Sequence, residues 1–89
     1  MKPVTMFTME DCPHCQRARR WMREVFAAHP EYGAVPLTII DEVEQPRIAA
    51  AYEYWYVPTY YVGDLKRHEG VASREIIEAV FQAAFETAG

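Results

Sequence analysis

The segment Cys12-Pro13-His14-Cys15 connects an apolar run to a helical pattern, and it holds both cysteines of the 89 residues. Pro13 suits the first turn of a helix, because the N–H group that proline lacks would have no intrahelical partner there. This predicts Cys12 at the N-cap, where free N–H groups and the helix dipole favour a thiolate. Two thiols at this spacing can close a small disulfide ring, so the pair is predicted to exchange two electrons with another disulfide or dithiol.

The first half of the chain has the pattern of a strand, a helix and a second strand. β-Branched and aromatic residues predict a buried strand over residues 4–8. Apolar residues at spacings of three and four then predict a helix that Pro30 and Gly33 end. The apolar run at 35–40 predicts a second strand, parallel to the first because the helix is long enough for a right-handed crossover.

A short helix is expected next. It should run from about Pro46 to Tyr52, with Ile48, Ala51 and Tyr52 available for the core.

The rest of the chain predicts a hairpin and a closing helix. Pro58 is expected to open a third strand, and Gly63-Asp64 to turn the chain into a fourth strand over residues 65–69. Ser73 is predicted to cap the last helix. The order β-α-β-α-β-β-α predicts an α/β fold with a four-stranded mixed sheet flanked by three helices.

Composition and charge limit the class of protein. A chain that is 51% hydrophobic and 25% charged predicts one compact domain over residues 1–89 with a modest core. The net charge of −4 argues against nucleic acid as a partner. Four arginines are expected to form a solvated helix face and to raise the positive potential near the thiols, namely Arg17, Arg19, Arg20 and Arg23.

No targeting or membrane segment is predicted. The apolar start gives way at once to Glu10-Asp11, which is too early for a signal peptide. No stretch approaches the ~20 apolar residues of a membrane span, so no membrane partner is expected. These features predict a cytoplasmic protein, in which a cysteine pair is more typical of catalysis or metal binding than of a structural disulfide.

The order of elements, the dithiol at a strand-to-helix junction and the Val57-Pro58 pair before the third strand together resemble the thioredoxin superfamily. Because no extra strand and helix precede the dithiol, the chain is most similar to the glutaredoxins, and the resemblance covers nearly all of it. It implies a thioredoxin-like fold of the glutaredoxin type. It also implies a dithiol thiol-disulfide oxidoreductase that reduces protein or glutathione-mixed disulfides.

Within the predicted catalytic segment, Cys12 is expected to be the attacking thiolate, since a substrate can reach the helix N-terminus. Cys15 lies one turn inside the helix and is expected to be the buried, resolving thiol. Pro13 and His14 lie between them, and the imidazole of His14 can favour the Cys12 thiolate electrostatically or by a hydrogen bond. The alternative is an exposed imidazole with little influence, because surface charges are screened.

The predicted substrate-binding residues are Tyr56, Val57, Pro58, Thr59 and Gly70. Pro58 resembles the cis-proline of the superfamily, which leaves the backbone of the preceding residue free to pair with a substrate strand or glutathione. An ordinary trans proline at a strand edge is the alternative, because cis bonds are uncommon even before proline.

Three aromatic residues, Tyr54, Trp55 and Tyr56, are expected to form a wall of the site, with at least one of them packed in the core. Glutaredoxins usually carry threonine where this chain has Tyr56, and a Gly-Gly pair and an aspartate where it reads Gly70-Val71-Ala72-Ser73. These departures remove expected glutathione contacts. Arg47 could bind a carboxylate, but a surface arginine is the simpler interpretation.

The predicted partners are disulfide-containing proteins or glutathione, with glutathione or a flavin-dependent thioredoxin reductase as the electron donor. A monomer without a tightly bound cofactor or metal is expected, with glutathione as a candidate co-substrate. Two other functions stay open. Cys12, His14 and Cys15 could take part in a metal or iron-sulfur site completed by a second subunit. The aromatic loop could also serve a non-catalytic peptide-binding module.

Overall fold

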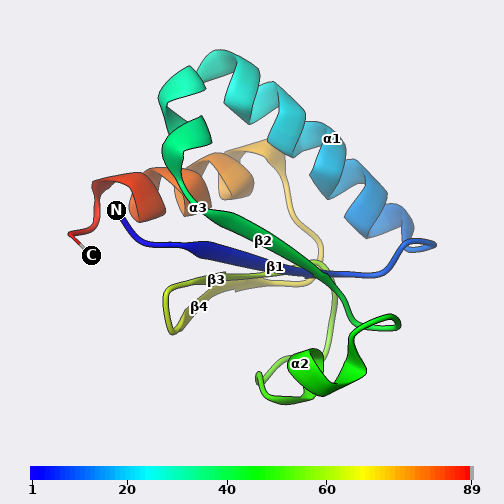
Figure 1. Cartoon of the computed structure of the whole chain (residues 1–89). Helices are drawn as coiled ribbons and strands as arrows, with labels where there is room; N and C mark the ends of the chain where they lie inside the picture. The colour runs from blue at the N-terminus through cyan, green and yellow to red at the C-terminus, as the bar shows by residue number, and fades with distance from the viewer. Residues whose placement is uncertain (89) are drawn as a thin grey trace.

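The computed structural model describes residues 1–88 (Figure 1). Its elements follow in the order β1 (Val4–Thr8), α1 (Pro13–Ala28), a 3-10 turn (Pro30–Ala34), β2 (Leu37–Asp41), α2 (Pro46–Ala50), β3 (Thr59–Val62), β4 (Leu65–Glu69) and α3 (Arg74–Glu86). This confirms the predicted succession β-α-β-α-β-β-α.

The four strands form one mixed sheet in the order β2-β1-β3-β4. β1 runs parallel to β2 and antiparallel to β3, and β3 pairs with β4 through the hairpin. Figure 1 shows α1 and α3 together on one face of the sheet and the short α2 on the other. This is the thioredoxin-like fold that the sequence implies.

The larger core lies between the sheet and the pair α1 and α3. Tyr60 is fully buried there, and its hydroxyl donates a hydrogen bond to Met22 Sδ at 3.1 Å, so the polar atom of this side chain is satisfied. A smaller cluster covers the opposite face and consists of Phe7, Ile40, Ala49 and Tyr61, with Tyr54 and Val57 packed against it. Both clusters hold the central strands β1 and β3 in place.

The prediction for α2 was wrong about which side chains enter the core. Ile48 is 45% exposed and Ala51 is exposed, whereas Ala49 is the buried residue of this helix. The helix has five residues, so it offers one position to the sheet, and the last two predicted positions lie beyond its end. Tyr52 is 37% exposed, although one side of its ring packs on Phe7 at a centroid distance of 4.7 Å.

Two strands begin later than predicted. β2 begins at Leu37, because Pro36 has no N–H for the ladder and the N–H of Val35 instead donates to Tyr32 O at 3.1 Å. β3 begins at Thr59, one residue after Pro58, for the same reason. Val35 is nevertheless buried, so the apolar run was correctly assigned to the core.

The hairpin and the last helix form as predicted. Gly63 has a φ of +56°, a conformation that glycine adopts without strain, and Gly63-Asp64 joins β3 to β4. Ser73 is the N-cap of α3, and its Oγ accepts a hydrogen bond from the N–H of Ile76 at 3.1 Å. Within residues 1–88, none of the helices combines the length and the apolar character that crossing a membrane requires.

Candidate active site

Cys12 occupies the N-cap of α1, as predicted. Its backbone is extended, with φ −84° and ψ 117°, and Pro13 takes the first helical position. The carbonyl of Cys12 accepts the first intrahelical hydrogen bond, from the N–H of Gln16 at 3.0 Å. The Cys12 side chain is therefore left at the positive end of a 16-residue helix.

The surroundings of Cys12 favour its thiolate. Partial burial raises the pKa of Cys12, but four other contributions outweigh this: hydrogen bonds from the Cys15 N–H, the Cys15 thiol and the His14 N–H, and the positive charge of Arg17. The net pKa of Cys12 lies below its ordinary value. A thiolate that is stable yet partly exposed has the properties of an attacking nucleophile.

Cys15 is in the opposite situation, since its side chain is fully buried. Burial raises the pKa of Cys15, and this outweighs hydrogen bonds that its sulfur accepts from the Thr8 hydroxyl and the Met9 N–H. The neighbouring Cys12 raises the Cys15 pKa further. Cys15 therefore stays a thiol and can donate its proton toward the Cys12 thiolate.

Thr8 and Arg19 are two residues of the site that the sequence did not reveal as such. Thr8 Oγ1 accepts a hydrogen bond from Arg19 Nη1 at 2.9 Å, so the hydroxyl proton of Thr8 is directed to another acceptor. The Cys15 sulfur is that acceptor. Thr8 ends β1, and this position, next to the cysteine turn, is the one sequence signal that could have indicated the contact.

His14 is exposed, and its ring contacts Arg17 rather than Cys12. Because arginine can only donate hydrogen bonds, His14 Nδ1 is the acceptor of this contact with Arg17 Nη2. The hydrogen bond that His14 gives to Cys12 comes from its backbone N–H. The predicted role of the imidazole in tuning the thiolate stays a prediction, whereas Arg17 supplies positive charge at the thiolate.

The peptide bond between Val57 and Pro58 is cis, as the resemblance implied. Pro58 is buried, and its carbonyl accepts a hydrogen bond from the N–H of Gly70 at 2.8 Å. Phe7 in β1 pairs with Thr59 in β3. Since these strands are antiparallel, the end of β1 that leads to the dithiol and the loop that leads into β3 lie at the same end of the sheet.

The remaining predicted substrate-binding residues lie in or against this loop. The buried hydroxyl of Thr59 donates to Tyr56 O at 2.5 Å. Gly70 has a φ of +92°, a conformation that other residues rarely adopt, and a Cβ placed on it would lie 3.9 Å from that of Tyr56. Thr59 and Gly70, both predicted to bind substrate, thus hold the loop from two sides.

The three aromatic residues have different environments. Tyr54 stacks on Phe7 at a centroid distance of 4.8 Å and donates its hydroxyl to Glu42 Oε1 at 2.7 Å, which confirms that at least one of the three packs in the core. Trp55 and Tyr56 are 89% and 70% exposed. They give the loop an open aromatic surface.

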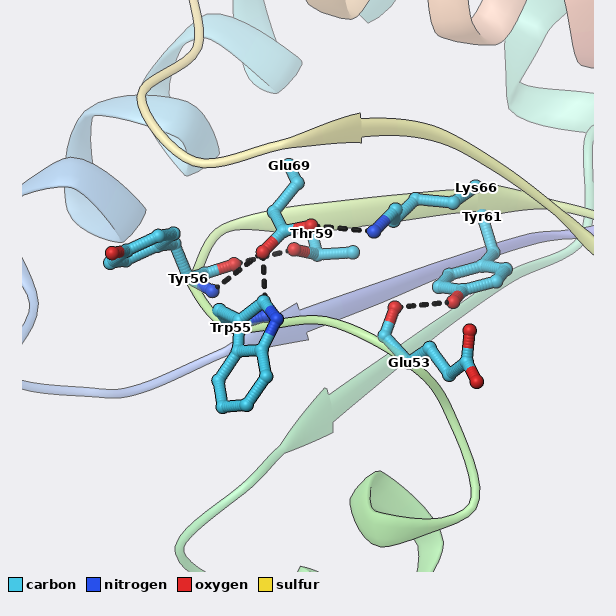
Figure 2. Close-up of polar contacts among 7 residues, drawn as sticks. All are labelled: Glu53, Trp55, Tyr56, Thr59, Tyr61, Lys66 and Glu69. Atoms are coloured by element: carbon cyan, nitrogen blue, oxygen red, sulfur yellow. Dashed lines mark hydrogen bonds and ion pairs between the residues drawn. The ribbon is translucent and has the colours of Figure 1, made fainter.

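Glu69, at the end of β4, is a residue of the site that the sequence analysis missed. Its carboxylate accepts hydrogen bonds from the backbone N–H groups of Trp55 and Tyr56 and from Lys66 Nζ (Figure 2). The hydrogen bond from Lys66, followed by that from the Trp55 N–H, lowers the pKa of Glu69 to about 2. No local pattern in the sequence marks this residue.

Two further features bear on binding. Arg47 is exposed on α2, in line with a surface arginine. Among residues 1–88, no group of three or more histidine, cysteine, aspartate or glutamate side chains is arranged to hold a metal ion.

Comparison with known proteins places the chain in a family. It is 32% identical over 78 residues to the thioredoxin of Methanocaldococcus jannaschii, a match that covers 86% of this chain and 89% of that protein. No family model matches the sequence, and no solved structure matches it with significance. The similarity extends over most of both chains and agrees with the fold and with the dithiol turn at the start of α1. The chain therefore belongs to the thioredoxin superfamily.

Proposed function

We propose that this chain is a thiol-disulfide oxidoreductase that reduces protein or glutathione-mixed disulfides through Cys12 and Cys15. The observation that carries the proposal is the difference between the two cysteines. Cys12 is partly exposed at a helix N-terminus and has a lowered pKa, whereas Cys15 is buried and has a raised pKa. The similarity to a thioredoxin supports the same activity.

The reaction proceeds in two exchanges. The Cys12 thiolate attacks one sulfur of the substrate disulfide, forms a mixed disulfide and releases the first substrate thiolate, which takes a proton from water. Cys15 then loses its proton and attacks the Cys12 sulfur, which releases the second substrate thiolate. The products are a reduced substrate and a Cys12–Cys15 disulfide, so two electrons have passed from the pair to the substrate.

The environment of Cys15 sets the order of these steps. The Cys12 thiolate is one of the groups that raise the Cys15 pKa. When Cys12 enters the mixed disulfide, its negative charge disappears, and the Cys15 pKa falls. Cys15 thus stays protonated before the first exchange and ionises more readily after it.

The loop that ends at Pro58 would align the substrate. The N–H and C=O groups of Val57 would pair with an extended peptide or with glutathione by β-type hydrogen bonds. Thr59 and Gly70 hold this loop through the carbonyls of Tyr56 and Pro58. The exposed ring of Tyr56 would contact the substrate beside the reacting disulfide.

A disulfide-reduction assay tests the proposal. The wild-type protein should reduce a peptide disulfide when a chemical dithiol regenerates it, and Cys12→Ser should abolish this activity. Activity that survives the substitution would overturn the assignment.

The electron donor is tested separately. We propose that the protein acts as a monomer in the cytoplasm, reduced there by glutathione or by a flavin-dependent thioredoxin reductase. Turnover measured with each reductant in turn decides between the glutaredoxin-like and the thioredoxin-like pathway. If DTT reduces the protein but neither glutathione nor the thioredoxin reductase does, a dedicated partner must supply the electrons.

A further inference from the structure

Glu69 uses both carboxylate oxygens to hold the loop that leads to Pro58. Oε2 accepts hydrogen bonds from the N–H of Trp55 at 2.5 Å and from the N–H of Tyr56 at 3.0 Å, and Oε1 accepts from Lys66 Nζ at 2.6 Å. Figure 2 shows the carboxylate between the loop and the lysine. The side chain of Glu69 is 18% exposed, so little of it is left to water.

An irregularity in the hairpin makes this arrangement possible. Tyr60 pairs with His68 but Tyr61 pairs with Lys66, so β4 carries one extra residue at this point. In a regular strand, residues three apart point to opposite faces. The extra residue reverses this relation, and Lys66 and Glu69 therefore reach the same face and form an ion pair.

The other contacts of the loop hold its carbonyl groups rather than these two N–H groups. The hydroxyl of Tyr61 donates to Glu53 O at 2.7 Å, and the hydroxyl of Thr59 donates to Tyr56 O at 2.5 Å (Figure 2). The N–H groups of Trp55 and Tyr56 bond instead to a side chain from β4. Removing the Glu69 carboxylate would leave the backbone immediately before Val57 without these two anchors.

We propose that Glu69 is a positioning residue for substrate binding: with Lys66 it fixes the backbone of Trp55 and Tyr56, so that Val57 meets a substrate strand in a preset geometry. The inference rests on the proposed function. It predicts a specific separation of effects, because Glu69 touches the loop and none of the groups around the Cys12 sulfur. Peptide substrates should depend on Glu69, and the intrinsic reactivity of the thiol should not.

The electrostatics of Glu69 support this role. Its lowered pKa shows that the surrounding donors stabilise the anion, so the carboxylate is charged throughout the neutral pH range. An amide in its place has one acceptor oxygen and adds two donors that face other donors. Glu69→Gln should therefore loosen the loop without a change in side-chain size.

The test compares two disulfides, one with a peptide backbone and one without. One is a peptide disulfide, which can pair with Val57, and the other is 5,5′-dithiobis(2-nitrobenzoic acid), which has no peptide backbone. For Glu69→Gln, the second-order rate constant for the peptide should fall roughly 5- to 20-fold, as expected for loss of charge-assisted hydrogen bonds. The rate constant for the small disulfide should stay within about twofold, and the pH profile of Cys12 alkylation should not move.

Glu53→Gln is the matched control, because it removes the same charge from the same loop, and only the backbone carbonyl of Glu53 bonds to Tyr61. Circular dichroism checks that each variant is folded. If Glu69→Gln does not fold, Lys66→Gln carries the test, with a smaller loss in the same direction. Equal losses for both disulfides, or no loss for the peptide, would overturn the inference. A wild-type protein that reduces neither disulfide would instead overturn the proposed function.

Discussion

The dithiol turn and the loop of residues 53–58 lie at the same end of the sheet but are held in different ways. In the turn, the Cys12 thiolate is stabilised by backbone N–H groups and side chains of α1 itself. In the loop, two backbone N–H groups donate hydrogen bonds to one carboxylate, that of Glu69 on β4. We therefore expect substitutions in different elements to change thiol reactivity and substrate alignment separately.

The largest effect should come from the nucleophile, and it distinguishes the role of Cys12 from that of Cys15. Cys12→Ser should remove all disulfide-reducing activity, because no thiolate remains at the helix N-terminus. In the Cys15→Ser variant, Cys12 should still attack a disulfide once, and the reaction should then stop at the mixed disulfide. Mass spectrometry of the trapped adduct is the measurement. An adduct on Cys15 in the Cys12→Ser protein, at the wild-type rate, would reverse the assigned roles.

A smaller effect is expected at Thr8, which separates the resolving step from the first attack. Thr8→Val removes the hydrogen bond to Cys15, so the Cys15 pKa should rise further and resolution of the mixed disulfide should slow by roughly 3- to 10-fold. Thr8→Ser keeps the hydroxyl and is the control. With a disulfide whose thiols are chromophoric, the first attack releases one thiol in a burst. The slower release of the second thiol measures the resolving step. An unchanged rate in Thr8→Val would show that the hydroxyl does not act on Cys15.

The dithiol turn could be predicted from sequence because its determinants are local. Pro13 begins the helix, and the residue before a helical proline becomes the N-cap, so the partly exposed Cys12 and the buried Cys15 follow from spacing alone. The hairpin was also predictable, since Gly63-Asp64 suits a tight turn. These elements depend on neighbours within a few positions.

The Glu69 contacts could not be predicted, because they depend on tertiary structure. They join residues 13 and 14 positions apart and require the extra residue in β4, which no pattern in residues 65–69 marks. The exposed Ile48 was missed for a related reason. Its apolar side chain suited a core position, but the helix around it is too short to bury more than Ala49.

Acid should weaken the contacts of Glu69 with the loop only well below neutral pH. The pKa of Glu69 is lowered to about 2 from an unfolded-state value of about 4.3, so its stabilisation is fully present above the unfolded value and is lost as the pH falls toward 2. The difference in free energy of unfolding between wild type and Glu69→Gln should therefore shrink as the pH falls from about 5 to 2.5. Urea denaturation at several pH values measures it. A difference independent of pH would contradict the assigned ion pair.

The smallest effect is expected at Arg17. Arg17→Gln removes a positive charge that lowers the Cys12 pKa, so the Cys12 pKa should rise and alkylation near pH 6 should slow about two- to threefold. Arg20→Gln, on the exposed surface of the same helix, is the control and should have less effect. Equal effects of the two substitutions would mean that only the overall charge of the helix acts on the thiolate.

The pH dependence of alkylation at each cysteine of the reduced protein tests the assigned roles of Cys12 and Cys15 most directly. Iodoacetamide labelling followed by mass spectrometry resolves Cys12 from Cys15. Cys12 should react first, with a pKa below that of a free cysteine, and Cys15 should react slowly, with a higher pKa. Faster labelling of Cys15, or a Cys12 pKa equal to that of a free cysteine, would contradict it.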